Sequence, residues 1–516
     1  MFFSGVKMKE IISIKLLIFY SAFLYFQIFS RADRSVKCSL TKVWGPGLDP
    51  ENIVLPARYF FIEAVNENKV SLNKSPGSVF SVEIKGLSGK SCRIWKNILD
   101  RKDGSFIVRY KLYEPCPQIS ISVKCHGEDL PGFPFKFSGI TYPDECSCKM
   151  YNNIDDWLSA NDCSASHKQI INDLKPFSSI NFEKIFHEAE QTLFKDPHKS
   201  SVCNYVIKNN EVYRTCYGQH TGFKMFVDAV LLSLTRKVNL PDLEILVNLG
   251  DWPLIEKKKN LDASKIIPLI SWCGNDVTWD IVWPTYDITE SSLENMGRVT
   301  LDMLSVQGNI DKVWEEKIPK LFWRGRDSSH ERLKLIEIAR QHSDLINASL
   351  TNFFFFRDLE AEYGPAMDRI SFFKFFDFKY QLNLDGTVAA YRFPYLLVSD
   401  SLVFKQDSTY YEHFYSDLQA WKHFVPVKKD LSDLIEKIKW AISHDVDALN
   451  IVKTAQSYAR SNLLPQQIFC YHLQLLKEYS KLQLNSSITV RPGMELVPQK
   501  ESSVCDCNVS AHREEL

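Results

Sequence analysis

The stretch Leu243-Glu244-Ile245-Leu246-Val247-Asn248-Leu249-Gly250-Asp251-Trp252-Pro253 decides the fold of the larger part of this chain. Its first seven residues form a short apolar run between Pro241 and Gly250, which is typical of a buried strand. Residues 222–238 before it place apolar side chains at helical spacing, and residues 401–404 form another short apolar run. Strands that alternate with helices in this way predict parallel α/β layers.

Asp251 follows the end of the predicted strand. In open α/β sheets, ligands bind at the carboxyl ends of the strands. A carboxylate at such a position, beside the indole of Trp252, can act as a general base. The alternative is an aspartate that only closes the turn before Pro253. The residues alone leave both interpretations open.

A basic run follows the apolar pair Leu321-Phe322, and its sequence is Trp323-Arg324-Gly325-Arg326-Asp327-Ser328-Ser329-His330-Glu331-Arg332. We expect a strand, a glycine-containing turn and a helix over residues 332–340. Free N–H groups at a helix N-terminus bind anions, and arginine adds forked donors for phosphate oxygens. The alternative is that surface arginines pair with Asp327 and Glu331.

Two further segments could contact a nucleotide. The run Leu384-Asp385-Gly386-Thr387-Val388-Ala389-Ala390-Tyr391-Arg392 is a small-residue turn closed by an arginine, which lets backbone amides approach a diphosphate, or else a tight turn that enters a packed helix. Asp445-Val446-Asp447 is an Asp-x-Asp pattern that binds metal in some nucleotide-sugar enzymes. Because it falls within a helical stretch, and Asp430 is a plausible cap for a helix over residues 431–448, we interpret it as a solvated face.

Residues 36–145 have a different pattern, in which apolar and polar residues alternate over short runs separated by turns. Phe80, Val82 and Ile84 alternate with polar residues, as do the apolar residues of 106–112 and 119–123. Period two predicts half-buried strands, and about a hundred residues of it predict a β-sandwich. We interpret this domain as a binding or spacing module. The alternative is that it only packs on its neighbour.

Three segments of this domain resemble the filamin-type immunoglobulin-like repeat. They are Gly45-Pro46-Gly47-Leu48, Asp103-Gly104-Ser105-Phe106-Ile107-Val108-Arg109-Tyr110 and Pro131-Gly132-Phe133-Pro134-Phe135.

Both ends of the chain carry targeting patterns. Lys7 and Lys9 precede an apolar stretch over residues 16–29 and a small, polar Ser30-Arg31-Ala32, which predicts a signal peptide over residues 1–31. The final Arg-Glu-Glu-Leu is a variant of the Lys-Asp-Glu-Leu retrieval signal. Together they predict the lumen of the endoplasmic reticulum and a retrieval receptor as partner. Residues 483–516 lack periodicity, so we expect a flexible tail that presents the signal.

An oxidising lumen favours disulfides over metal sites for the 13 cysteines, and their odd number leaves at least one free or paired between chains. A bond from Cys470 to Cys146 or Cys148 would tie together the ends of the larger domain. Glycosylation sequons occur at Asn73, Asn347, Asn485 and Asn508. A net charge of −1 argues against nucleic acid as partner. No apolar run after the signal is long enough to span a membrane.

Residues 146–482 resemble glycosyltransferase family 90, the capsule-associated type, and within it the luminal protein O-glucosyltransferases that modify epidermal-growth-factor-like (EGF) repeats of Notch. The order of signal peptide, filamin-like domain, this domain and retrieval tail resembles the KDEL-motif-containing subgroup. The resemblance implies a two-lobed Rossmann-like fold of the GT-B type, with the lobes facing across a cleft. It also implies UDP-glucose as donor and no metal cofactor.

The resemblance also implies roles for particular residues. The family carries its catalytic base in an Asp-aromatic-Pro motif, which corresponds to Asp251. Acceptor contacts fall on Thr221, Gly222, Phe223, Lys224 and Met225. Donor contacts fall on Arg326 and Arg332, where the single-domain relative has Ser at the position of Arg326, and on Thr387, Val388, Ala389, Ala390, Tyr391 and Arg392.

The expected activity is inverting transfer of glucose to serine hydroxyls of EGF-like repeats. One alternative is transfer of xylose, because one hydroxymethyl group separates the donors and a pocket distinguishes them by only ~1–3 kcal/mol. A second alternative is a non-catalytic luminal binding protein with a degenerate α/β domain. The presence of Asp251 together with Arg332 and Arg392 argues against decay of the site.

Overall fold

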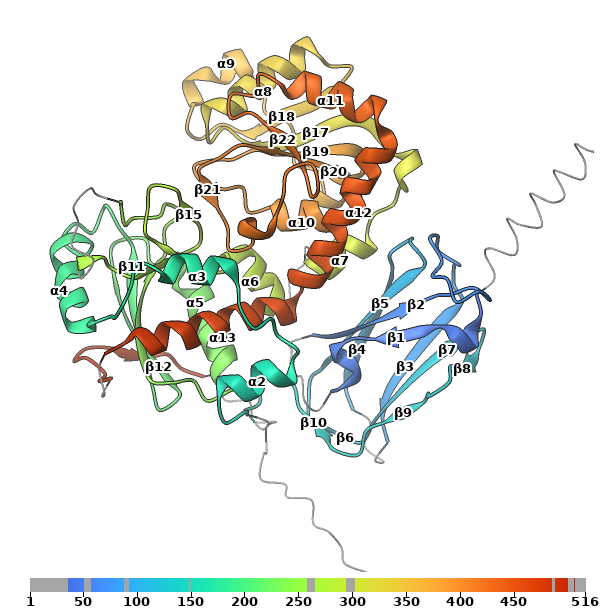
Figure 1. Ribbon diagram of the computed structural model, residues 1–516, viewed down its shortest axis with the longest axis horizontal. Coiled ribbons are helices and arrows are strands. Elements are labelled where there is room, and N and C mark those ends of the chain that lie inside the picture. The colour runs from blue at the N-terminus through green and yellow to red at the C-terminus, as the bar shows by residue number, and fades with distance from the viewer. Residues whose placement is uncertain are drawn as a thin grey trace, which may run out of the picture.

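The computed structural model describes residues 36–50, 57–87, 92–147, 150–257, 265–293, 302–484, 488–499 and 505. The predicted signal peptide, the retrieval signal and the sequons at Asn485 and Asn508 lie outside the described residues. Figure 1 shows a β-sandwich, in blue, beside two α/β lobes that lie one above the other. In the described ranges, no helix combines the length and the apolar character that crossing a membrane requires.

The N-terminal body is a sandwich of two antiparallel sheets, as predicted. The first sheet has the order β1-β2-β5-β4, with β1 at Lys42–Trp44, β2 at Arg58–Glu63, β5 at Ser105–Leu112 and β4 at Ile94–Asp100. The second sheet contains β3 (Phe80–Gly86), β7 (Ile119–Cys125), β8 (Glu128–Asp129) and β9 (Phe135–Lys136). The short strands β6 (Cys116–Pro117) and β10 (Ile140–Thr141) pair with each other.

The central strands of the first sheet, β2 and β5, are buried on both faces. Phe106 and Val108 point into the core between the two sheets. Tyr59, Phe61 and Ile107 belong instead to the apolar core of the α/β part, because the opposite face of this sheet packs on it. The alternation predicted for residues 106–112 is therefore confirmed for the face that packs between the two sheets. On the opposite face, Ile107 is buried by the neighbouring domain. The sandwich is packed on the α/β part and is not separated from it by a linker.

Polar contacts and one close approach reinforce this packing. Arg109 Nη1 lies 2.9 Å from Asp302 Oδ2, with both side chains largely buried. At the other end of the interface, Arg460 Nη1 lies 2.7 Å from Asp103 Oδ2. Between them, Leu99 of β4 packs on helix α7 (Met303–Gly308).

The first lobe is built on a six-stranded sheet of order β16-β14-β13-β11-β12-β23. Its strands are β11 (Val202–Lys208), β12 (Glu211–Tyr217), β13 (Leu243–Asn248), β14 (Leu269–Ser271), β16 (Ile281–Val282) and β23 (Glu495–Leu496). Its helices are α2 (Ile154–Ala160), α3 (Lys168–Leu174), α4 (Phe182–Thr192), α5 (Lys224–Thr235), α6 (Tyr286–Leu293) and α13 (Pro465–Leu482). The predicted strand and helix around Asp251 correspond to β13 and α5.

This first sheet is mixed, and only part of it has the parallel pairing predicted. β13, β14 and β16 are parallel, but β11 runs antiparallel to both β12 and β13. A two-residue turn at Asn209 and Asn210, both with positive φ, joins β11 to β12. Asparagine tolerates this left-handed conformation, which the tight hairpin requires.

The second lobe has a fully parallel sheet of order β18-β17-β19-β20-β22. Its strands are β17 (Ile318–Arg326), β18 (Ile346–Asn352), β19 (Phe378–Asn383), β20 (Leu402–Gln406) and β22 (Val425–Val427). Its helices are α8 (His330–Gln341), α9 (Glu360–Tyr363), α10 (Phe393–Val398), α11 (Leu434–Ser443) and α12 (Asp445–Asn462).

Short 3₁₀ turns occur in all parts of the described chain, at Cys38–Leu40, Pro46–Leu48, Trp314–Glu316, Arg357–Leu359, Phe372–Asp377 and Tyr415–Asp417.

The predicted helix over residues 431–448 is wrong in its bounds. The chain forms α11 and then breaks at His444, and α12 begins at Asp445. Asp430 does not cap α11, since its carboxylate accepts from the N–H of Ser432 before the helix starts. Asp445 lies at the start of α12, where Lys379 and the indole N–H of Trp314 donate to it. The Asp-x-Asp pattern is therefore a helix start held by protein groups.

The two lobes share an apolar core and one small sheet. Phe393 and Tyr395 of α10, with Ala455 of α12, belong to the same buried cluster as the first-lobe strands. In addition β15 (Gly274–Asn275) from the first lobe pairs with β21 (Tyr410–Tyr411) from the second. Figure 1 shows α12 descending from the upper lobe and α13 crossing the lower one. These contacts fix the facing edges of the two sheets.

The prediction of a flexible tail over residues 483–516 is wrong for its described part. β23 pairs with β12, and Val497 is buried. Arg491 Nε lies 2.7 Å from Glu244 Oε1 on β13. Short runs of tail residues add an edge strand to the sheet, and this pairing depends on tertiary contacts that periodicity within the tail does not reveal.

Five disulfides link the described cysteines, in agreement with the predicted use of this residue. They are Cys38–Cys125, Cys92–Cys116, Cys146–Cys505, Cys163–Cys470 and Cys203–Cys216. The predicted partner of Cys470 is therefore wrong, because α13 brings it beside Cys163. Cys146 instead ties the beginning of the α/β part to its C-terminal segment, and Cys148 lies outside the described residues. Cys273 is free and buried, as the odd count allows.

The packing of the sandwich on α7 predicts a strong effect of Gly308→Leu. A Cβ at this position would lie 2.4 Å from Leu99 Cβ, so a larger side chain forces the two domains apart. We expect a loss of about 1–3 kcal/mol in the free energy of unfolding, which urea denaturation measures. Gly222→Ala is the control, because a Cβ there meets nothing within 4 Å. Equal stability of the two variants would contradict the close packing.

Candidate active site

The carboxyl ends of strands from both lobes meet at one cleft. β13 ends just before Asp251 in the first lobe, while β17 ends at Arg326 and β19 leads into residues 384–392 in the second. A cavity of about 470 Å³ lies between them. It is lined by Asp251, Tyr286, Asp287, Arg324, Arg326, Arg332, Arg369, Phe375, Arg392 and residues 386–391, among others. The sequence-predicted base and all the predicted donor-binding residues therefore line a single cavity.

Asn248 holds the turn that carries Asp251. Its side-chain oxygen accepts from the N–H of Gly250 at 2.9 Å, and its amide nitrogen donates to the carbonyl of Trp252 at 2.7 Å. Asp280 then accepts the N–H groups of Leu254 and Ile255, which anchor the chain beyond Pro253. These bonds give the Asp251 side chain a fixed direction from the end of β13.

Asp251 also lines a second cavity, of about 310 Å³, on the first lobe. Its other walls include Ser201, His220, Phe223 and Trp252. Burial raises the pKa of Asp251, and the charge of Arg326 opposes this rise. A carboxylate with a raised pKa is a stronger base, and one that separates two cavities can reach molecules bound on both sides.

Gly325 lies within β17 and not in the predicted turn. A Cβ at this position would lie 2.5 Å from the ring of Trp323, so glycine lets the indole fold against the strand. The strand continues to Arg326 because β18 pairs along it, with a register shift at the last step. The helix predicted over 332–340 is confirmed as α8.

Asp327 does not pair with the neighbouring arginines. Its carboxylate is fully buried and accepts hydrogen bonds from the backbone N–H groups of Phe354, Phe355 and Phe356, at 2.6–2.9 Å. The alternative interpretation of the basic run as surface ion pairs with Asp327 is therefore wrong. The positive charges of this run stay available to the cavity.

Arg332 fixes the shape of the cavity from beneath. Its Nε donates to the carbonyl of Asp385 at 2.8 Å and its Nη2 to that of Leu384 at 3.1 Å. Its Nη1 donates to the carbonyl of Arg326 at 3.0 Å and to Ser328 Oγ at 2.7 Å. Four of its five N–H groups are thus used within the protein. Burial lowers the pKa of Arg332 to about 9, and the charge of Arg392 adds to this effect.

Arg392 and Arg326 present positive charge to the cavity in different ways. Arg392 Nη1 donates to the carbonyl of Arg324 at 2.7 Å, and burial lowers the pKa of its guanidinium to about 10. Arg326 is exposed, and within the described ranges no group forms a hydrogen bond or ion pair with its side chain. No carboxylate of the described residues lies within 4 Å of either guanidinium, so the two arginines can bind an anion together.

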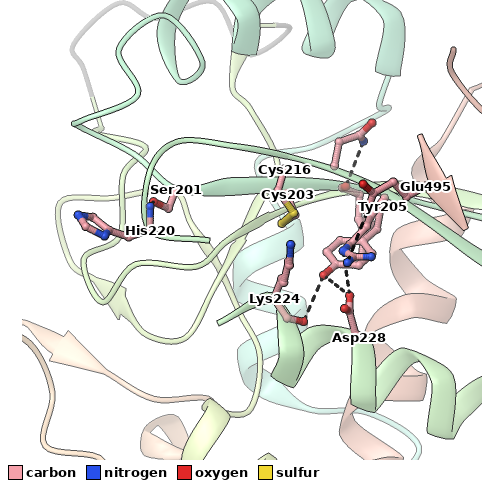
Figure 2. Close-up of a disulfide and its surroundings, with 11 residues drawn as sticks. Ser201, Cys203, Tyr205, Cys216, His220, Lys224, Asp228 and Glu495 are labelled. Atoms are coloured by element: carbon pink, nitrogen blue, oxygen red, sulfur yellow. Dashed lines mark hydrogen bonds and ion pairs between the residues drawn. A yellow bond between two sulfur atoms is a disulfide. The ribbon is translucent and has the colours of Figure 1, made fainter. Parts of the chain in front are cut away.

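The predicted acceptor segment enters α5 beside the second cavity. Phe223 lines that cavity, while Met225 is 47% exposed on the surface. Lys224 points toward the Cys203–Cys216 disulfide, as Figure 2 shows, and its carbonyl accepts from the hydroxyl of Tyr205. Thr221 and Gly222 form the turn before the helix, without lining either cavity.

The disulfide in Figure 2 keeps the walls of this second cavity together. It joins β11 to β12, whose ends continue to Ser201 and His220. Ser201 Oγ accepts from the backbone N–H of His220 at 3.2 Å, so the two walls are also bonded directly.

Sequence reasoning missed several residues that line the larger cavity. Arg369 and Ile370 come from a segment without any recognisable pattern, and Tyr286 and Asp287 come from the first turn of α6. The only available signal for the last two was Pro284, which separates a short apolar run from a helix. Arg324 was part of the basic run but had no assigned role.

Comparisons with known proteins identify two families that match this chain. The family description "Glycosyl transferase family 90" matches residues 158–515, and "Filamin/ABP280 repeat" matches residues 35–136. The chain is 48% identical to protein O-glucosyltransferase 2 of Danio rerio, over 93% of this chain and 94% of the relative. It is 47% identical to protein O-glucosyltransferase 3 of Homo sapiens, over 92% and 94%.

The chain belongs to glycosyl transferase family 90. It is a glycosyltransferase with an N-terminal filamin-type domain. Protein O-glucosyltransferase 1 of Homo sapiens is 28% identical over 66% of this chain and 86% of the relative.

Two solved structures align with parts of this chain at low TM-scores. The filamin domain of Lin-41 covers 20% of this chain and 94% of that chain, with 10% identity and a TM-score of 0.16. TarM covers 82% of this chain and 75% of that chain, with 9% identity and a TM-score of 0.28.

Two sequons lie in the described part of this family 90 protein. Asn73 is exposed in a loop of the filamin-type domain, where an oligosaccharide has room. Asn347 lies in β18, and its side-chain oxygen accepts from Arg324 Nη2 at 2.7 Å. In the folded protein the Asn347 side chain therefore helps to hold Arg324 at the cavity.

The buried bonds of Arg332 predict that Arg332→Ala destabilises the protein. The variant leaves three carbonyls and one hydroxyl without their donor, so we expect a loss of about 2–4 kcal/mol in the free energy of unfolding. Arg326→Ala, which removes an exposed guanidinium from the same cavity, should change it by less than about 0.5 kcal/mol. Urea denaturation measures both. The positioning role of Arg332 is wrong if the two variants are equally stable.

Proposed function

We propose that this protein is an inverting protein O-glucosyltransferase. It moves glucose from UDP-glucose to a serine hydroxyl of EGF-like repeats in the lumen of the endoplasmic reticulum. The observation that carries this proposal is the position of Asp251 between two cavities, one lined by arginines and one open on the first lobe. The names of the relatives, protein O-glucosyltransferases 2 and 3, support the choice of sugar and of a protein acceptor.

The larger cavity suits the nucleotide sugar. The guanidiniums of Arg326 and Arg392 and the backbone of residues 386–390 lie on the second-lobe side, where the diphosphate would bind. They stabilise the negative charge that develops on UDP as the anomeric bond breaks, so we propose that the reaction needs no metal ion. Within the described ranges, His, Cys, Asp and Glu side chains have metal-ligand spacing only at Cys38, Cys125 and His126, in the filamin-type domain, and these two cysteines form a disulfide.

The smaller cavity suits the acceptor. Its rim carries the exposed side chains of Phe223 and Trp252, with Met225 close by in α5. An EGF-like repeat is a folded domain, and a shallow surface with exposed apolar side chains can hold it while one serine enters the cavity. Asp251 then takes the proton from the serine hydroxyl as the oxygen attacks the anomeric carbon. The C–O bond to UDP breaks on the opposite side, so an α-linked donor gives a β-linked product.

The proposed location follows from the chemistry of the cysteines and from the ends of the chain. Five disulfides among the described residues require an oxidising compartment for their formation. The predicted signal peptide and retrieval signal supply entry and retention, with the retrieval receptor as a further partner. Incubating the purified protein with a folded EGF-like repeat and either UDP-glucose or UDP-xylose, followed by mass spectrometry, tests activity and sugar together.

Asp251→Asn should lower turnover about 10²–10⁴-fold, because the amide cannot accept the serine proton. Binding of UDP, measured by calorimetry, should persist, since the arginines are untouched. Asp276→Asn removes an exposed carboxylate from the same lobe and should keep near-normal transfer. Turnover of Asp251→Asn within about 10-fold of the wild type would remove Asp251 from the role of base.

Arg326→Gln should shift the pH dependence of transfer. Asp251 must be deprotonated to act, so the rate falls on the acid side as pH drops through its pKa. Arg326 lowers this pKa, and its loss allows burial to raise the pKa further. The acid limb of kcat/KM should therefore move to higher pH in the variant.

The matched control is Arg369→Gln, which removes another arginine of the cavity, whereas Arg326 is the arginine whose charge opposes the raised pKa of Asp251. Its acid limb should coincide with that of the wild type. An unmoved limb in Arg326→Gln would mean that Asp251 is not the titrating base.

A further inference from the structure

A second carboxyl group lines the donor cavity. Asp287 lies in the first turn of α6, on the first-lobe side, and faces the cavity together with Asp251. Unlike Asp251, it does not line the smaller cavity on the first lobe. It therefore borders the proposed donor cavity alone, whereas Asp251 borders both cavities and is the better placed of the two to act as base for the serine hydroxyl.

The carboxyl of Asp287 has no partner of its own among the described residues. There, no N–H or O–H group donates to it, and no cation lies within 4.0 Å. Burial raises the pKa of this carboxyl to about 7, the charge of Glu290 adds to the rise, and Arg392 opposes it. The side chain is half-buried and borders the cavity, so a ligand bound there can complete the hydrogen bonds of this carboxyl.

The distribution of charge shows which part of a nucleotide sugar this contact would be. Arg326 and Arg392 can hold the diphosphate, whereas carboxyls at Asp251 and Asp287 would repel it. A neutral sugar ring offers hydroxyl groups as donors, and a carboxylate accepts them with charge-assisted hydrogen bonds. The sugar therefore belongs between the two aspartates and the arginines.

We propose that Asp287 accepts hydrogen bonds from the hydroxyl groups of the donor hexose and so positions the anomeric carbon against Asp251. This assignment rests on the proposed glucosyltransferase function. Asp287 is a sugar-binding residue on this account, and its charge also faces Arg392, which holds the end of the 384–392 segment to β17 through the carbonyl of Arg324.

The first test separates sugar from diphosphate. Asp287→Ala in the full chain should lower kcat/KM for UDP-glucose about 10- to 100-fold, the usual effect of losing a hydrogen bond to a charged group. The inhibition constant of UDP, which lacks the sugar, should stay within about two-fold, because the arginines still bind it. Asp276→Asn removes an exposed carboxylate of the same lobe that does not line the cavity, and should retain wild-type kcat/KM.

The second test uses donors that lack single hydroxyl groups. With the wild type, the deoxy donor that lacks the contacting hydroxyl should lose about as much kcat/KM as Asp287→Ala loses with UDP-glucose. With Asp287→Ala the same donor should lose little more, because the interaction is already absent. The isosteric Asp287→Asn, which keeps the volume of the side chain, should give an intermediate loss.

Each remaining outcome overturns the assignment. If UDP inhibition weakens in parallel with kcat/KM, in Asp287→Asn as well as in Asp287→Ala, Asp287 acts only through the charge of Arg392 and does not bind the sugar. If every deoxy donor gives independent, multiplicative losses with the variant, Asp287 does not contact the sugar. If the wild type binds UDP but transfers no sugar from UDP-glucose, the proposed function fails first, and the sugar contact fails with it.

Discussion

The donor cavity depends on the buried guanidinium of Arg332. It donates to the carbonyls of Leu384 and Asp385, and to the end of β17 at Arg326, so one side chain joins α8 to the loops after two parallel strands. A buried cation without partners would be costly, and the carbonyls satisfy it while the residual positive charge adds to that of its neighbours. Gly386 lies against it, because a Cβ there would meet Arg332 Nη2 at 3.0 Å. The same contact thus shapes the cavity and makes it positive.

Much of the fold could be predicted from periodicity, because burial on one or both faces of an element determines the spacing of its apolar residues. The strand before Asp251 is mostly apolar because β13 is covered on both faces, and the alternation in β5 reflects the core between the two sheets of the sandwich. What could not be predicted depends on contacts between distant segments. Pairing of β23 with β12, and of Cys470 with Cys163, arises only once the chain has folded.

The site was predictable where a motif carries the chemistry, as in Asp251 and in residues 387–392, all of which line one cavity. It was not predictable where a single ordinary residue reaches the cavity from a helix, as Asp287 does from α6. Motifs also misled where packing explains them better. Gly325 is a glycine because Trp323 lies against it, and Asp327 holds three backbone amides in place of an arginine.

The titrating groups of the cavity are shifted by one common cause. Burial raises the pKa of Asp251 and Asp287 and lowers that of Arg332 and Arg392, so each charged form is disfavoured before a ligand arrives. A bound diphosphate supplies negative charge, which again favours the charged form of the arginines. A neutral sugar supplies no charge, so the carboxyls keep their raised pKa. The proposed base, Asp251, would therefore stay strong while the leaving group is stabilised. This separation requires acids and arginines on opposite lobes, which the cleft between two sheets provides.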